Sequence, residues 1–274
     1  MNAAWGNRNL WIGLVVTALM AATALLAMIW TPYPPTAIDT LHRLAAPSGA
    51  HLLGTDGLGR DVLSMLMAGS FVPIAVASVA VLVGAGIGVP LGGLAAACGG
   101  WVDGLVMRAT DLVFAFPALL TAVMITALSG PGMKNAMLAI GIFNISVFAR
   151  VTRGAARGIW LRQFVLAARL AGRSDFAISA RHVLPNIASV LIVQVTIQFA
   201  VAIVADAGLS YVGLGTQPPQ PSWGRMLNDS QSFIWKAPML AVFPGLAITL
   251  AVLGLNLLGD GLQDVLDPRR RRPR

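Results

Sequence analysis

Six long runs of apolar residues, separated by polar segments, dominate the sequence. They lie at residues 10–30, 73–97, 105–128, 135–151, 185–207 and 238–258. A helix needs roughly 20 such residues to cross a bilayer. Inside hydrocarbon every backbone amide must be hydrogen bonded within its own segment, so these runs are expected to be helices. The pattern predicts an all-α integral membrane protein with about six transmembrane helices.

The composition supports this class. The chain is 57% hydrophobic and only 11% charged, whereas a soluble domain has about 25% charged residues. The first apolar run is followed by "WTPYPP" and lacks a small-x-small cleavage pattern, so we expect it to be a retained span. The single cysteine, Cys98, can form no internal disulfide, and the three histidines lie far apart. We therefore expect no metal site.

The basic residues predict the orientation. With a cytoplasmic N-terminus, fourteen of the 19 Lys and Arg residues fall in inside segments and five in outside segments. Cytoplasmic loops carry the excess of Lys and Arg, so both termini are expected inside. The basic segment between the fourth and fifth spans then faces the cytoplasm. Two long segments, 31–70 and 208–237, are expected outside. The arginines of 266–274 form a basic cytoplasmic tail that anchors this end inside, and binding of anionic membrane lipid is the alternative.

The glycine-rich stretch "GAGIGVPLGG" contains no lysine and matches neither common phosphate-binding loop. Gly84, Gly88 and Gly92 are four residues apart, so they line one helix face and allow a second helix to approach. We expect helix packing here, and the chain lacks its own nucleotide site.

Three polar residues fall within or near the spans: Asp111, Asn144 and Asp206. Intramembrane ionisable groups are candidates for a transport path. The plainer interpretation, which we prefer, is that the two aspartates lie near span ends and contact water or a partner chain. Arg108 is three residues from Asp111 and could neutralise it.

The cytoplasmic segment contains signals for two short helices and a bend. Residues 161–171 are compatible with a helix, Gly172 can end it in a left-handed conformation, and Ser174 or Asp175 can cap the next. Pro185 can stand in the first turn of the fifth span. An amphipathic loop resting on lipid headgroups is the alternative.

At this segment the sequence resembles the membrane-spanning subunits of ABC importers. Their signature is Glu-Ala-Ala, three residues, Gly, nine residues, then Ile-x-Leu-Pro. Ala167, Ala168, Gly172 and Leu184-Pro185 fall at that spacing, while Leu166 replaces the glutamate and His182 the isoleucine. "RHVLPN" is the form found in the dipeptide/oligopeptide/nickel branch.

Three other stretches are similar to the C-type subunits of that branch. They are "HLLGTDGLGRDVLS" at 51–64, "LSYVGLGTQPPQPSWGRML" at 209–227 and "LGDGLQDVLDPR" at 258–269. The first carries the family's outer motif, which the resemblance assigns to Gly54, Thr55, Asp56, Gly59, Arg60 and Asp61.

The resemblance implies a type I ABC importer transmembrane-domain fold with cytoplasmic coupling helices. It divides the chain into an N-terminal span and outer segment (1–70), the transmembrane domain (71–265) and the tail (266–274). It implies no catalysis by this chain, a homologous B-type permease as partner, two ATPase subunits that bind ATP and Mg, and an extracytoplasmic binding protein. The residues that it places in or beside the ATPase-coupling segment are Ala167, Ala168, Gly172, Ser174, Asp175, Arg181 and Pro185.

The implied function is one half of the translocation path of an ATP-driven importer of di- or oligopeptides in the cytoplasmic membrane. A permease for nickel or another small solute is the alternative within the family. A stand-alone secondary transporter is the alternative outside it, although the two halves of the chain show no duplication of the kind such folds contain.

Overall fold

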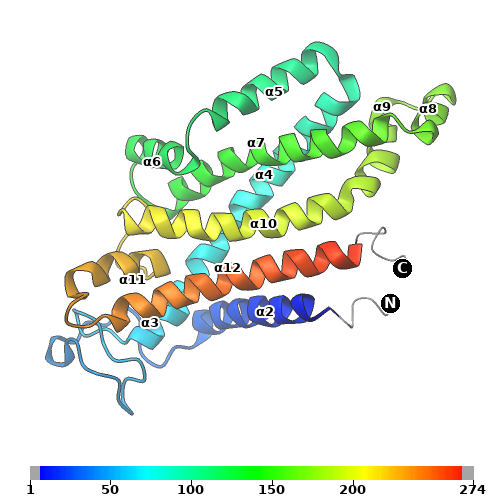
Figure 1. Cartoon of the computed structure of the whole chain (residues 1–274). Coiled ribbons are helices and arrows are strands. Elements are labelled where there is room, and N and C mark those ends of the chain that lie inside the picture. Colours follow the sequence, from blue (N-terminus) through cyan, green and yellow to red (C-terminus); the bar gives the residue numbers. More distant parts are fainter. Residues whose placement is uncertain (1–6, 267–274) are drawn as a thin grey trace.

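The computed structural model describes residues 7–266, and helices make up most of that range (Figure 1). Five helices are long: α2 (Arg8–Ile29), α4 (Phe71–Cys98), α7 (Met133–Trp160), α10 (Leu184–Tyr211) and α12 (Met239–Leu266). The shorter helices are α3 (Val62–Gly69), α5 (Gly100–Phe114), α6 (Ala118–Ser129), α8 (Gln163–Leu170), α9 (Asp175–Ile178) and α11 (Trp223–Ser230). One π turn, η2 (Ser179–Val183), and two 3-10 turns, η1 (Thr40–His42) and η3 (Gln231–Phe233), complete the described elements.

The described residues provide five helices that are long and apolar enough to cross a membrane. A sixth span exists if the bent pair formed by α5 and α6 is counted as one. The all-α membrane class and the number of spans are therefore as the apolar runs predict. The division of the chain at residues 70 and 265 stays a prediction, and the arginines of the tail lie outside the described residues.

The third span differs from the continuous helix expected over 105–128. Helices α5 and α6 meet at an angle of 82°. Proline at position 117 has no backbone N–H and disfavours helical geometry in the residue before it. Phe116 accordingly lies outside both helices, and Pro117, at the N-cap position of α6, has φ of −55° and ψ of 131°, which is not helical. Pro117 was the sequence signal for this break.

The fourth span is longer than the predicted 135–151. Helix α7 continues from Met133 to Trp160 and carries Arg150, Arg153 and Arg157 along its second half. Two of these arginines form ion pairs with aspartates of α5. A charged residue that is paired in this way need not end a helix. The predicted end of the fourth span at residue 151, which rested on the charge of Arg150, is therefore too early.

Glycines bring α4 and α7 into close contact. A Cβ atom at Gly84 would lie 2.4 Å from Cβ of Asn144, and one at Gly88 would lie 2.5 Å from the carbonyl oxygen of Ile145. At Gly92 it would lie 2.2 Å from the carbonyl oxygen of Ala149. These distances leave no room for a side chain, so the small residues allow the two backbones to pack directly together.

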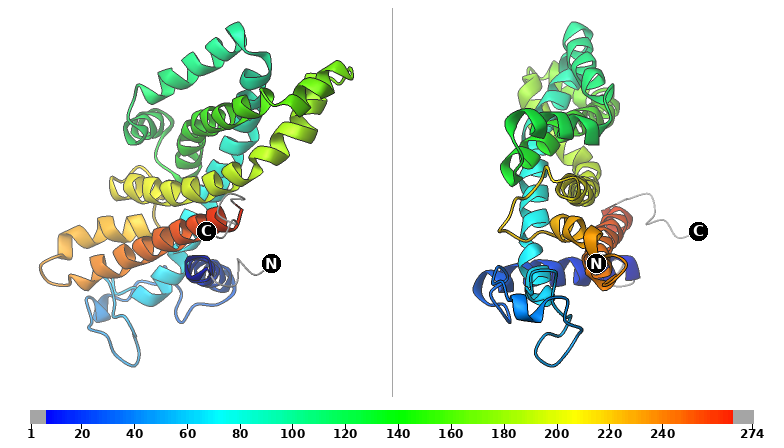
Figure 2. Two further views of the ribbon diagram at one scale, coloured as in Figure 1. Left: turned by 45° about the vertical axis from the view of Figure 1, so that its right-hand side comes forward. Right: turned by 90° about the vertical axis from the view of Figure 1, so that its left-hand side faces the viewer.

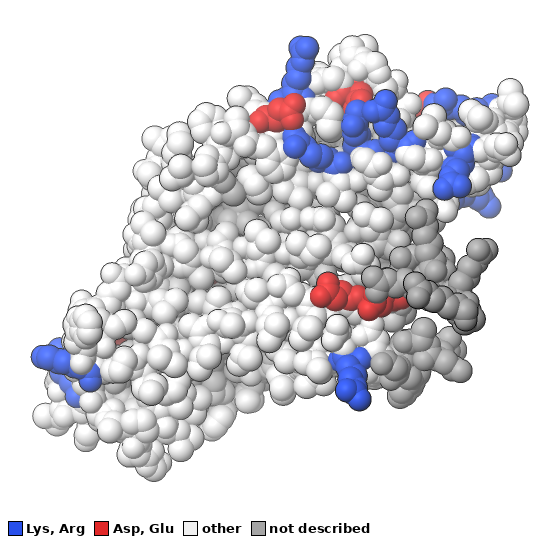
Figure 3. Space-filling model, in the orientation of Figure 1, with Lys and Arg blue, Asp and Glu red and all other residues white. Residues whose placement is uncertain are grey.

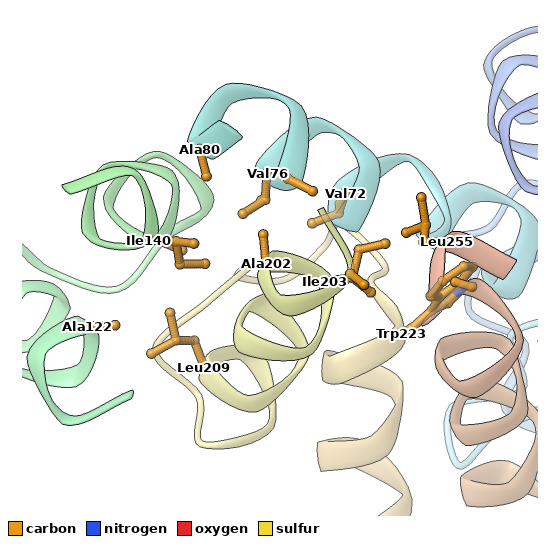
Figure 4. Close-up of a cluster of buried hydrophobic side chains, with 14 of the residues drawn as sticks. Val72, Val76, Ala80, Ala122, Ile140, Ala202, Ile203, Leu209, Trp223 and Leu255 are labelled. Carbon is orange, nitrogen blue, oxygen red and sulfur yellow. The ribbon is translucent and has the colours of Figure 1, made fainter. Parts of the chain in front are cut away.

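The main hydrophobic core lies between α4, α7 and α10, near the end of the bundle occupied by α11. Val76 and Ala80 of α4 point toward Ile140 of α7 and Ala202 of α10 (Figure 4). Trp223 of α11 extends this core toward α12, and its indole N–H donates to the carbonyl oxygen of Leu66 at 3.0 Å.

Helices α2 and α12 pack against each other, and in both views of Figure 2 the blue helix α2 lies next to the red end of α12. Asn7, the N-cap of α2, donates from Nδ2 to Oδ2 of Asp264 near the end of α12 at 3.1 Å. The start of α2 and the end of α12 therefore lie at the same end of the bundle. Helices α8 and α9 project from that end too (Figure 1). The segments 30–61 and 212–238 lie at the opposite end.

Candidate functional site

The candidate coupling segment, residues 161–183, stands out from the end of the bundle. It comprises α8, the turn at Gly172, α9 and η2, and it joins α7 to α10 (Figure 1). Lys and Arg side chains gather at this end of the molecule (Figure 3). The segment is therefore a distinct, basic projection between two long helices.

Gly172 ends α8 in the left-handed conformation that the sequence predicts, with φ of +76°. The Arg173 amide donates to the carbonyl of Ala168 at 3.1 Å, and the Gly172 amide donates to that of Arg169 at 2.9 Å. This pair of bonds is a Schellman motif, which satisfies the last carbonyls of a helix when glycine follows it. The bend is thus fixed by backbone hydrogen bonds.

Ser174 caps α9, as one of the two predicted alternatives. Its hydroxyl accepts from the Ala177 amide at 3.3 Å. Asp175, in the first turn of α9, accepts from Nε of Arg169 at 3.2 Å, and the Arg169 guanidinium lies 4.9 Å from the Trp160 ring centroid. Arg169 therefore links α8 to α9 and to the end of α7.

A small hydrophobic core fastens the segment to the bundle. Val165 of α8, Ile178 of α9 and Val183 of η2 are buried and pack with Ala156 and Trp160 of α7. Together with the bonds at Gly172, this packing makes the segment a rigid extension of α7 and α10, because close-packed side chains transmit displacement.

The outer face of the same segment carries exposed apolar residues. The exposed fractions are 90% for Leu170 and 83% for Phe176, which flank the Gly172 turn, and 78% for Leu161. Exposed apolar residues that gather on one short projection with polar neighbours are typical of an interaction site. The exposed Arg162, with Arg173 on the Gly172 turn, supplies the polar surroundings. We call this the Leu170–Phe176 face.

The junction with the fifth span corrects the prediction. No helix end separates α9 from α10: residues 175–211 are helical throughout, with the π turn η2 before Pro185. A proline ring would clash with the carbonyl four residues earlier in an α-helix, and the wider π turn relieves that clash. Nδ2 of Asn186 donates to the His182 carbonyl at 2.7 Å.

The other predicted residues of the coupling segment differ in their exposure. Ala167 and Arg181 are exposed, whereas Ala168 is half-buried against the small core. Leu166, in the place of the signature glutamate, is exposed on α8. The half-buried His182 ring lies 6.2 Å from the ring of Phe164.

The outer motif is a folded turn at the opposite end of the bundle. Thr55 and Asp61 form an antiparallel bridge, and the hydroxyl of Thr55 also binds the His42 carbonyl. Gly54 and Gly59 have φ of +77° and +80°. A Cβ atom at Gly59 would overlap the carbonyl oxygen of Asp39. Both glycines are therefore required by the turn.

The two aspartates of the motif organise this turn. Asp61 caps α3, accepts from the amide and the hydroxyl of Ser64 at 2.8 and 2.7 Å, and lies 2.9 Å from Nδ1 of His51. Asp56 accepts from the amide and Nε of Arg60 at 2.8 and 2.7 Å. In the loop before the motif, a hydrogen bond from the His42 side chain lowers the pKa of Asp39.

The polar residues of the spans depart from expectation. Asp111 pairs with Arg150 of α7 and not with Arg108. The unpredicted pair of Asp103 with Arg153 also joins α5 to α7, with 2.8 Å between Nε and Oδ1.

Asp206 is only 1% exposed, so the expectation that it contacts water or a partner chain is wrong. Asn144 is likewise buried, facing α4. Among residues 7–266, no group of three or more metal-ligating side chains could hold an ion.

Comparison with known proteins identifies the family. The profile described as "Binding-protein-dependent transport system inner membrane component" matches residues 88–272. The "Glutathione transport system permease protein GsiD" of Pectobacterium atrosepticum is 43% identical over 252 residues, which are 92% of this chain and 84% of the relative. The "Dipeptide transport system permease protein DppC" of Alkalihalophilus pseudofirmus is 38% identical over 265 residues, which are 97% and 87%.

These matches span nearly the whole chain, and the helical architecture agrees with them. The family consists of transport proteins that work with other subunits of an ABC transporter and is not known for enzymatic activity. The chain belongs to the binding-protein-dependent transport system inner membrane components, and it is a multi-pass membrane permease with the type I ABC importer fold.

Proposed function

We propose that this chain is one of two permease subunits in an ATP-driven importer of di- or oligopeptides. The relatives named for dipeptide and glutathione transport support peptides as the cargo class. The path lies between this chain and a homologous B-type permease, and an extracytoplasmic binding protein delivers the cargo. Nickel or another small solute is the alternative cargo within the family.

In this proposal the coupling segment and both termini face the cytoplasm. This orientation places fourteen of the 19 Lys and Arg residues in cytoplasmic segments, and that excess is the basis for it. The ATPase subunits bind ATP and Mg, and one of them docks on the Leu170–Phe176 face. Exposed apolar side chains with polar neighbours are typical of surfaces that bind a partner, which supports docking at this face.

The mechanism follows from the attachment of the segment. Its small core ties it to α7, and the unbroken helix from 175 to 211 ties it to the main core through α10. When the ATPases close on ATP, the docked segment moves as a lever and carries α10 with it. Rigid-body movement of packed helices is a common way to switch such a path between its two sides.

The observation that carries the proposal is the exposure of Phe176 and Leu170 on either side of a rigid bend. The test is ATP-driven dipeptide uptake by proteoliposomes that contain this chain, its partner permease, both ATPases and the binding protein. Phe176→Ala should reduce uptake about tenfold, because a buried aromatic anchor contributes more than about 1 kcal/mol to an interface.

Trp235 offers a matched control, since it is 97% exposed in the segment between η3 and α12, far along the chain from the coupling segment. Trp235→Ala should leave the dependence of uptake on the ATPases unchanged. Uptake by this chain alone under an ion gradient would instead identify a secondary transporter and contradict the proposal.

A further inference from the structure

A cavity of about 360 Å³, with charged and apolar side chains in its lining, lies at the end of the bundle opposite the coupling segment. One wall comes from the outer turn and includes Arg43, Asp56 and Arg60, and the other comes from α11 and η3. Pockets for small ligands have volumes from about 300 to 1,000 Å³. The cavity therefore has the size of a site for a small ligand.

The charges that line this cavity leave one positive charge in excess. Three arginines (43, 60 and 225) face two aspartates (56 and 229). Arg60 Nη2 lies 2.6 Å from Asp56 and 3.3 Å from Asp229, and Nε of Arg225 lies 2.9 Å from Asp229. Both carboxylates are thus neutralised from within the cavity.

Arg43 is the arginine without a carboxylate. Its Nε donates to the carbonyl of Gly57 at 2.6 Å, which fixes the guanidinium at the cavity wall. Over residues 7–266, no Asp or Glu oxygen lies within 4.0 Å of its nitrogens. A guanidinium can bind a carboxylate through two parallel hydrogen bonds, so an arginine without a carboxylate in the lining is suited to an acidic ligand.

The remainder of the lining is largely apolar. Met65, Met226, Phe233 and Leu240 contribute to it. Gly57 lets the Phe233 ring lie against the outer turn, since a Cβ atom there would be 2.4 Å from the ring. A ligand that satisfies this cavity carries one carboxylate beside an apolar group.

The two walls are joined before any ligand binds. The Arg60–Asp229 ion pair connects residues 169 positions apart in the sequence, and Trp223 of α11 donates to the carbonyl of Leu66 in α3. A site held in this way loses little conformational freedom on binding, which favours affinity.

We infer that this cavity binds the C-terminal carboxylate of a peptide whose last side chain is apolar. The choice of a peptide rests on the proposed function. An acidic side chain of a docking protein would pair with Arg43 but leave the apolar lining unfilled, so a small peptide suits the cavity better.

The test is a calorimetric titration of the full chain in lipid nanodiscs, without ATP or ATPases. The probes are alanyl-leucine and alanyl-leucine amide, which differ only at the carboxylate. The amide should bind at least about tenfold more weakly than the acid. This is the change expected when the charge-assisted pair between the ligand carboxylate and Arg43 is lost. Arg43→Gln should weaken binding of the acid to a similar extent and leave the amide unaffected.

Lys236→Gln is the matched control, because Lys236 is an exposed cation at the same end and does not line the cavity. It should change neither titration. Absence of dipeptide binding, equal binding of acid and amide, or equal effects of the two substitutions would overturn the inference. ATP-driven uptake that still depends on Phe176 would then leave the proposed function standing.

Discussion

Gly172 determines the bend of the coupling segment through its backbone and not through the space around it. A Cβ atom at this position would meet no atom within 4 Å, yet φ is +76°. Left-handed geometry costs a residue with a side chain roughly 1–2 kcal/mol. A substitution at this position therefore tests the effect of backbone strain without steric overlap.

Gly172→Ala is expected to lower the free energy of unfolding by about 1 kcal/mol and to weaken the coupling of ATP hydrolysis to uptake. Thermal unfolding of the purified chain, together with uptake per ATP hydrolysed, measures both effects.

Gly154→Ala provides the comparison for that variant. Gly154 is exposed within α7 and also has open space at its Cβ, but it is helical. Alanine is preferred over glycine inside a helix by about 0.5–1 kcal/mol, so this variant should be slightly stabilised. If both variants lost the same stability, strain at Gly172 would not explain the first result.

The turn at Gly172 could be predicted from the sequence because its signals are local. Gly172 and Ser174 lie within three residues of each other and each specifies a helix end. The cavity beside Arg43 could not be predicted in this way. It depends on contacts between residues far apart in the chain, such as Arg60 with Asp229.

At the level of the helices, α5 is the element whose position depends most on ion pairs. Thr110 is its one buried residue among those described, so apolar packing contributes little to holding it. Arg153–Asp103 and Arg150–Asp111 attach it to α7. The first pair is shielded from solvent, with side chains 26% and 19% exposed, and the second is more open.

A double-mutant cycle with Asp103→Asn and Arg153→Gln should give a coupling energy of about 1–2 kcal/mol, since shielded charges are less screened. The same cycle at Asp111 and Arg150 should give less than about 1 kcal/mol, as is usual for exposed pairs. Chemical unfolding in detergent provides the four free energies of each cycle. A larger value for the exposed pair would contradict the assigned role of Arg153.

The helices themselves were predictable where apolar runs are uninterrupted. The break between α5 and α6 follows a single proline, and the extra length of α7 depends on aspartates about 40 to 50 positions away. The continuity of α9 with α10 requires a π turn, for which the segment before Pro185 contains no distinctive sequence signal. The local pattern of apolar residues therefore predicts the spans, whereas the exact ends of the helices depend on contacts between residues far apart in the sequence.

For the molecule as a whole, the two ends of the bundle have different roles in the proposal. One end presents the coupling segment, and the opposite end presents the folded outer turn and its cavity (Figure 1). Helix α10 reaches from the first end toward the second, and its buried residues form part of the main core. Movement at the coupling segment is thus expected to reach the outer side through α10.

The most direct measurement of this proposal is photo-crosslinking in living cells with a reactive amino acid at position 176 or, as control, at position 235. Position 176 is expected to form a covalent adduct with a cytoplasmic ATPase subunit, while position 235 forms none with it. An adduct with the ATPase from position 235, or reaction of position 176 with extracellular protein only, would contradict the claim that the Leu170–Phe176 face receives the ATPase.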